Sequence, residues 1–214
     1  MSEPPEFLTP EDLIDLYRIG LFPMAESADD QGLSIVEPRI RALLPVDNLH
    51  IPSRLKRTVR QHPFEIRIDT AFADVIEGCA TARPETWINH DIRSLFIELH
   101  QRGIAHSVEC WKEGELVGGL YGLALGQVFC GESMFSRATD ASKIALIHLC
   151  ARLKAGGFKL LDAQFHNPHL DQFGVYQMPQ SEYTASLMRL RDNPADFKLE
   201  GKSAAALLAA YLGA

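Results

Sequence analysis

The chain has 214 residues, a length that predicts one large domain or one domain with a small appendage. Its composition, 46% hydrophobic and 23% charged, is that of an ordinary globular protein. No apolar run approaches the roughly 20 residues that span a bilayer, which excludes a helical membrane protein, and the formal charge of −7 argues weakly against nucleic acid as a partner.

The first elements form a small N-terminal unit. Thr9 is a strong N-cap with Pro10 at the first helical position, and the predicted helix ends near Ile19. Residues 21–24 are expected to form an apolar turn. Pro38 opens the next segment, in which residues 40–45 read as a strand. We therefore place a soft boundary there, between a unit of residues 1–38 and a main domain of residues 39–214.

A basic helix follows at residues 53–62. It carries four cations within seven residues, which is unusual in an acidic protein: Arg54, Lys56, Arg57 and Arg60. A solvated helix face and a contact with a phosphate backbone both fit this pattern.

The middle of the chain alternates helices with strands. Helices are predicted at 70–80, with Asp69 as its cap, and at 90–102, and strands at 64–68, 106–111, 116–125 and 127–130. A long helix at 141–155 and a strand at 158–162 complete a β-β-β-α-β run. The order favours an α+β fold around a mostly antiparallel sheet flanked by helices, and it resembles the GNAT (acyl-CoA N-acyltransferase) fold.

Two stretches gather polar groups at the predicted end of a strand. Residues 129–143 read as a strand end, a turn and a helix cap, with Glu132 beside the apolar Met134 and Asp140 as a cap. In the strand that ends near residue 162, Asp162 and Gln164 are two apart and are expected to face the same side.

Several chemistries compete for these residues. No Ser or Cys lies in a nucleophile elbow, and the four cysteines, without CxxC spacing, read as reduced buried thiols rather than zinc ligands. His166, His169 and Asp171 are weak evidence for a metal. Asp162 and Gln164 suit a group transfer that is catalysed by positioning the substrates. Alternatively, they only form hydrogen bonds with the backbone of the loop. Trp87 reads as a core aromatic or as a stacking platform for a base.

Five segments together resemble the leucyl/phenylalanyl-tRNA–protein transferase family. They are FCGESMFSRATDASKIAL (129–146), LLDAQFHNPHL (160–170), VGGLYGLALG (117–126), VIEGCA (75–80) and ETWI (85–88), in family order and spacing. The resemblance implies a GNAT-like domain and transfer of Leu or Phe, with Met as a further candidate, from aminoacyl-tRNA to proteins with N-terminal Arg or Lys. It implies marking of those proteins for N-degron degradation, with no metal or other cofactor, in a cytoplasmic monomer without a membrane partner.

The resemblance also assigns roles by position. It makes Asp162 and Gln164 the catalytic pair and places Glu132 in the acidic region that receives the basic acceptor. The basic helix at residues 53–62 matches the tRNA-binding region. The pocket for the aminoacyl group and the terminal adenosine is assigned Leu120, Phe129, Met134, Leu146, Leu149, Leu161, Trp87 and Met24, the last standing where the family often has Trp.

Two other classes stay open at this level. An acetyl-CoA-dependent N-acetyltransferase would need a Gly-rich pyrophosphate loop before a helix, and residues 136–140 contain no glycine. A non-catalytic RNA-binding or degron-binding module would form no peptide bond.

Overall fold

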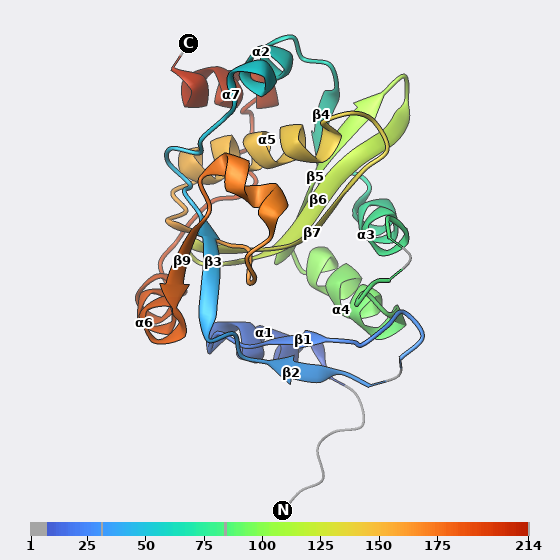
Figure 1. The fold of residues 1–214 in the computed structure, drawn as a ribbon, viewed down its shortest axis with the longest axis vertical. Coiled ribbons are helices and arrows are strands. Elements are labelled where there is room, and N and C mark those ends of the chain that lie inside the picture. Colours follow the sequence, from blue (N-terminus) through green and yellow to red (C-terminus); the bar gives the residue numbers. More distant parts are fainter. Residues whose placement is uncertain (1–7, 31, 84, 214) are drawn as a thin grey trace, which may run out of the picture.

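The computed structural model describes residues 8–30, 32–83 and 85–213, which form a mixed sheet flanked by helices (Figure 1). The helices are α1 (Pro10–Arg18), α2 (Ser53–Arg60), α3 (Phe72–Thr81), α4 (His90–Gln101), α5 (Ala141–Ala155), α6 (Gln180–Leu190) and α7 (Ala204–Leu212), with a 3-10 helix, η1, at Pro168–Phe173. The strands are β1 (Phe22–Met24), β2 (Ser34–Val36), β3 (Ile40–Leu44), β4 (Glu65–Ile68), β5 (Ala105–Lys112), β6 (Glu115–Leu125), β7 (Val128–Ser136), β8 (Leu160–Asp162) and β9 (Tyr176–Pro179).

Within these residues the main sheet has seven strands in the order β4-β5-β6-β7-β8-β3-β9. Every neighbouring pair is antiparallel except β7–β8, which is parallel and is connected through α5. A parallel pair needs such a crossover, because the chain must return to the same end of the sheet. The predicted α+β class, the mostly antiparallel sheet and the β-β-β-α-β order are thus confirmed.

The two faces of the sheet bury different sets of side chains. Along β7, Phe129 faces the cluster of α2, α5 and α7, and Cys130 faces the cluster of α1, α3, α4 and α6. Leu120 and Tyr121 on β6 alternate in the same way, as the two-residue period of a strand requires. Figure 1 shows α5 lying across one face with α2 and α7 beyond it, while α3 and α4 lie on the other side.

Strand β7 is longer than the sequence predicts. We expected a turn after Cys130, but β7 continues to Ser136 and stays paired with β6. The pairing passes from Tyr121–Ser133 to Gly122–Gly131, which leaves Glu132 as the extra residue of a β-bulge. A bulge interrupts strict alternation, and this is why the segment did not read as a strand.

The expected apolar turn at residues 21–24 is also a strand in part. Residues 22–24 form β1, which pairs antiparallel with β2 in a separate two-stranded ribbon. The predicted capping of α1 by Thr9 is confirmed, with Asp12 completing a capping box. The division of the chain at residue 38 stays a prediction.

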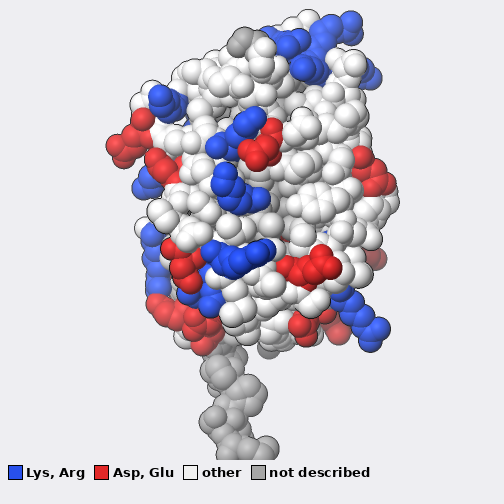
Figure 2. Space-filling view, turned by 90° about the vertical axis from the view of Figure 1, so that its left-hand side faces the viewer, with Lys and Arg blue, Asp and Glu red and all other residues white. Residues whose placement is uncertain are grey.

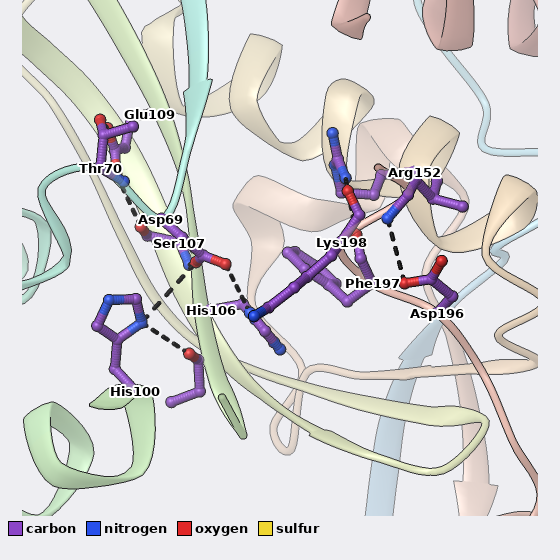
Figure 3. A network of polar contacts seen from close by, with 12 residues as sticks. Asp69, Thr70, His100, His106, Ser107, Glu109, Arg152, Asp196, Phe197 and Lys198 are labelled. Atoms are coloured by element: carbon purple, nitrogen blue, oxygen red, sulfur yellow. Dashed lines mark hydrogen bonds and ion pairs between the residues drawn. The ribbon is translucent and has the colours of Figure 1, made fainter. Parts of the chain in front are cut away.

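The start of α3 is held by a buried glutamate instead of by the predicted cap. Asp69 has a φ of 59°, and α3 begins only at Phe72, so the prediction that Asp69 caps this helix is wrong. Glu109 of β5, fully buried, accepts hydrogen bonds from the backbone N–H groups of Thr70 and Ala71, both at 2.8 Å. Figure 3 shows this carboxylate directed at the turn before α3.

The same network crosses the sheet toward the C-terminal segment (Figure 3). Asp69 Oδ2 lies 2.7 Å from Nδ1 of His106, whose ring stacks on Phe197. Arg152 of α5 donates to the carbonyls of Phe197 at 2.7 Å and Lys198 at 2.8 Å. These bonds satisfy polar groups that would otherwise be unpaired in the interior.

None of the helices in the described ranges combines the length and apolar character needed to cross a bilayer.

Replacing Glu109 by Gln should lower the free energy of unfolding by about 2 kcal/mol, the cost of leaving a buried donor unpaired. The new amide NH₂ would face N–H groups at the start of α3 or the indole of Trp111, which donates to Glu109 at 2.9 Å. Urea unfolding measures the change, with Glu115→Gln at an exposed position as the matched control. Equal stability of both variants would contradict this role of Glu109.

Candidate active site

A cavity of about 550 Å³ opens where β7 and β8 separate. The β7–β8 ladder ends at the pair Cys130–Asp162, and β7 runs on while β8 stops. Carboxyl ends of parallel strands are frequent ligand sites, because diverging backbones leave room between them. The loop after β8 and the helix η1 close the other side through residues 163–170.

One wall of the cavity is apolar. It contains most of the side chains that the sequence assigned to the aminoacyl pocket: Leu120, Met134, Leu146, Leu149 and Leu161. Leu44 and Leu170 extend this wall, and sequence reasoning missed both. Phe129 is not in the lining, since it is fully buried behind it and stacks on Phe197.

The opposite wall carries the polar groups. Gln164 donates from Nε2 to Glu132 Oε1 at 3.2 Å, so the carboxyl group fixes the orientation of the amide. Gln164 is nearly buried and has a φ of 55°, an uncommon conformation for a residue with a side chain. We expected Asp162 and Gln164 to face the same side of one strand, but β8 ends at Asp162. The turn after β8 brings the two side chains together instead.

Asp162 is fully buried and its carboxylate is saturated with donors. Oδ1 accepts from Arg41 Nε at 3.0 Å and from the backbone N–H of Gln164 at 2.9 Å. Oδ2 accepts from Arg41 Nε at 3.0 Å and from the Tyr183 hydroxyl at 2.9 Å, and Arg41 Nη2 lies 2.9 Å away. Asp162 therefore binds the backbone N–H of Gln164 and makes no hydrogen bond to the side-chain amide of Gln164.

Arg41 is the counter-charge of Asp162 and is also fully buried. Its guanidinium lies 4.2 Å from the ring centre of Tyr183 and 5.1 Å from that of Phe22, and Nη1 donates to the carbonyl of Gly20 at 3.2 Å. Burial lowers the pKa of Arg41, but the charge and hydrogen bond of Asp162 together with Tyr183 and Cys130 outweigh burial, so the net shift is upward. Burial raises the pKa of the Asp162 carboxyl, and the charge of Arg41 opposes the rise. Arg41 keeps its proton and the two form an ion pair.

Glu132 projects from the bulge of β7 beside this pair. Burial raises the pKa of its carboxyl to about 8, with the Asp162 charge adding to the rise and a hydrogen bond from Tyr17 opposing it. Near neutral pH the group is poised between its two forms. A cation that entered the cavity would favour the ionised form.

The mouth of the cavity is lined by aromatic rings and one thioether. Trp87 and Met24, both assigned from the sequence, lie in the lining together with Phe22 and Phe165. The rings of Phe22 and Phe165 meet edge to face, 5.7 Å apart between centroids, although Phe165 is 45% exposed. Such surfaces suit the face of a planar ligand.

One fully buried polar atom of the lining lacks a partner. The hydroxyl of Tyr121 is buried and makes no hydrogen bond to any described residue. A buried hydroxyl without a partner is costly, and this one lies near Glu132, whose charge adds to burial in raising the pKa of Tyr121.

The basic helix α2 lies apart from the cavity lining. Lys56, Arg57 and Arg60 border a shallow hollow on its outer side. Figure 2 shows Lys and Arg side chains gathered at the upper end of the molecule, where Figure 1 places α2. Arg54 does not border this hollow. Its Nη2 lies 3.6 Å from Oδ2 of Asp140, at the start of α5.

Other chemistries find less support in these groups. Burial raises the pKa of Cys79, which lies beside Ser133 of β7, to about 12, and this keeps it a thiol at neutral pH. All four cysteines are buried free thiols, and none of them forms a disulfide. Of the proposed metal ligands, His166 and Asp171 pair at 2.6 Å, and no cluster of three or more such side chains suits a metal among the described residues.

Sequence reasoning missed the groups that hold the polar wall in place. Arg41, Tyr17 and Tyr183 come from β3, α1 and α6, far from the motifs in sequence. Only a charged residue inside the apolar run at 40–44 hinted at a buried Arg41.

The comparisons with known proteins agree with the resemblance in the sequence. A sequence model described as leucyl/phenylalanyl-tRNA protein transferase matches residues 43–188. The leucyl/phenylalanyl-tRNA–protein transferase of Hyphomonas neptunium is 56% identical over 88% of this chain and 74% of its own length. Proteins of the same name from Phenylobacterium zucineum and Caulobacter vibrioides are each 54% identical, over 90% and 88% of this chain and 89% and 88% of their own lengths.

The raised pKa of Glu132 can be measured directly. In protein labelled with ¹³C at glutamate side-chain carboxyls, one resonance should titrate near pH 8 and disappear in Glu132→Gln. Tyr17→Phe removes a bond that favours the ionised form and should raise this midpoint further.

The same shift has a consequence for stability. Because the folded pKa exceeds the ordinary value, wild-type stability should fall relative to Glu132→Gln as the pH rises from about 4.5 to 8. A carboxyl that titrates below pH 5 would contradict both expectations.

Proposed function

The chain belongs to the leucyl/phenylalanyl-tRNA–protein transferase family and is an aminoacyltransferase, and on that premise we propose that it moves leucine or phenylalanine from aminoacyl-tRNA to proteins with N-terminal Arg or Lys. The observation that carries the proposal is one cavity that joins an apolar wall to an acidic, amide-bearing wall. The first accommodates an uncharged side chain such as Leu, Phe or Met, and the second accommodates a basic group.

The apolar wall is assigned to the donor. Leu146, Leu149 and Leu161 offer hydrocarbon surface without a polar group, which favours aliphatic or aromatic side chains by burial alone. Met134 is unbranched and polarisable, so it adapts to ligands of different shape. Trp87 and Met24 at the mouth would then lie against the terminal adenosine of the donor.

The polar wall is assigned to the acceptor. An ionised Glu132 would pair with the guanidinium or ammonium group of the N-terminal residue, and binding of that cation favours ionisation. An acceptor with a neutral or acidic first residue would bring no cation to favour the ionised form of Glu132.

The reaction needs no covalent intermediate, because an aminoacyl ester is already activated. The α-amine of the acceptor attacks the ester carbonyl carbon, a C–N bond forms, and the C–O bond to the ribose breaks. The nitrogen loses a proton and the leaving ribose oxygen gains one. The role of the protein is to bring the two groups together and to stabilise charge that develops on the nitrogen.

Gln164 is the residue assigned to the attacking amine. Its Nε2 is bound to Glu132, and no described residue hydrogen-bonds to its Oε1, which therefore can accept a hydrogen bond from the amine. Asp162 is buried beneath it and already bound by Arg41, Tyr183 and the Gln164 backbone. We assign Asp162 as a positioning residue that sets Gln164 in place.

The same proposal covers the setting of the reaction. The β5-β6-β7-α5-β8 order supports the GNAT-like assignment, and α2 is assigned to the body of the tRNA because of its four cations. We place the enzyme in the cytoplasm as a monomer that marks its acceptors for N-degron degradation.

Transfer of label tests this function. Radiolabelled Phe-tRNA or Leu-tRNA is mixed with a peptide that begins with Arg, and matched peptides begin with Ala or carry an acetylated N-terminus. The Arg peptide should acquire label. Glu132→Gln should raise KM for the Arg peptide by about tenfold or more, as expected for loss of a charged hydrogen bond, with little change in KM for the donor.

A parallel reaction with acetyl-CoA separates the alternatives. Acetylation of the peptide would show an N-acetyltransferase, and binding of tRNA without any peptide-bond formation would show a non-catalytic module. Either result would contradict the proposal.

A further inference from the structure

A group of basic side chains borders the cavity on the side of α5. Arg83 and His169 lie in the cavity lining, and Lys143 is in the first turn of α5. Lys143 and Arg83 each lie within electrostatic range of His169, because their charges add to burial in lowering the pKa of His169, while Asp140 opposes the shift. His169 is therefore a neutral hydrogen-bonding group beside two cations, of which Arg83 is exposed.

Asp140 connects this group to helix α2. It stands at the N-cap position of α5 with a φ of 63°, yet its side chain makes no capping bond, so the predicted cap is wrong in that respect. Its oxygens instead lie 2.8 Å from Lys143 Nζ and 3.6 Å from Arg54 of α2. Two cations share one carboxylate, which leaves a net positive charge between the cavity and α2.

A second hollow leaves the cavity mouth in another direction and has the opposite charge. It shares Met24 and Trp87 with the cavity, and its lining contains Glu26 and Glu85. A polyanion bound across Trp87 would be repelled there and attracted past Arg83 toward Lys143.

We propose, on the basis of the function proposed above, that Arg83, Lys143 and His169 bind the phosphodiesters of the unpaired 3′ end of the donor RNA, between the ester in the cavity and the tRNA body on α2. Arg and Lys bind phosphate oxygens through charge-assisted hydrogen bonds, and a neutral imidazole donates one more. This rim holds the end of the strand in register with Gln164, whereas α2 contributes to affinity for the folded tRNA alone.

Three donors that differ in their phosphates test the proposal. Phenylalanyl-adenosine has no phosphodiester, the phenylalanylated trinucleotide CCA has the terminal ones, and Phe-tRNA has the whole backbone. The rim variant is Arg83→Gln with Lys143→Met. The α2 variant is Lys56, Arg57 and Arg60 all changed to Gln, which leaves the pair of Arg54 with Asp140 intact. Arg189→Gln on α6, an exposed cation away from the cavity lining, is the matched control.

The donors should separate the two basic regions. With the trinucleotide as donor, the rim variant should raise KM about tenfold. It should also reduce the slope of log KM against log salt concentration by about 0.7 for each phosphate contact that the protein loses. It should leave phenylalanyl-adenosine unchanged. The α2 variant should affect Phe-tRNA and spare the trinucleotide, and Arg189→Gln should affect none.

A positive charge at position 143, in Lys or in Arg, should be sufficient to keep the low KM for the trinucleotide. Lys143→Arg keeps the ion pair with Asp140 and should retain the KM for the trinucleotide, while melting temperatures show that each variant is folded. An unchanged KM and salt slope for the trinucleotide in a folded rim variant would overturn the proposal. Absence of product from phenylalanyl-adenosine with the wild-type protein would instead count against the proposed function.

Discussion

The buried ion pair between Arg41 and Asp162 is the interaction on which the polar half of the cavity depends. Both side chains are fully buried, and each would be costly without the other. Together with Tyr183 and the carbonyl of Gly20, the pair ties β3 and β8 to α6 and to the turn after α1. Oδ1 of Asp162 also accepts a hydrogen bond from the backbone N–H of Gln164, which holds that residue in its unusual backbone conformation.

The two faces of the sheet explain how one cavity has two different walls. Strand alternation directs Leu120 and Leu161 toward α5 and directs Tyr121 and Asp162 toward the opposite cluster. The bulge in β7 then adds Glu132 to the polar side, facing Gln164. The apolar wall thus belongs to the core that α5 completes, and the polar wall belongs to the core that the N-terminal elements complete.

The sequence predicts the regular elements well, because caps, glycine stops and hydrophobic periods are local signals. It also brings Asp162, Gln164 and Glu132 to attention, through their motifs. It does not reveal that Asp162 is bound to Arg41, since that pair joins residues 121 positions apart without a local pattern. It misplaces the end of β7 because a single bulged residue shifts the two-residue period. It also suggests Asp69 as a cap where Glu109, on another strand, fills that role.

The central claim is that Asp162 acts only through Gln164. A double-mutant cycle on kcat for peptide-bond formation, with Asp162→Asn, Gln164→Ala and the double variant, tests it most directly, and Tyr183→Phe provides a second perturbation of Asp162 without loss of charge. If Asp162 only positions Gln164, Asp162→Asn should lower kcat in the wild type and have almost no further effect once Gln164 is Ala. Independent, multiplicative losses in folded variants would contradict the claim, because they would mean that Asp162 stabilises the transition state by itself.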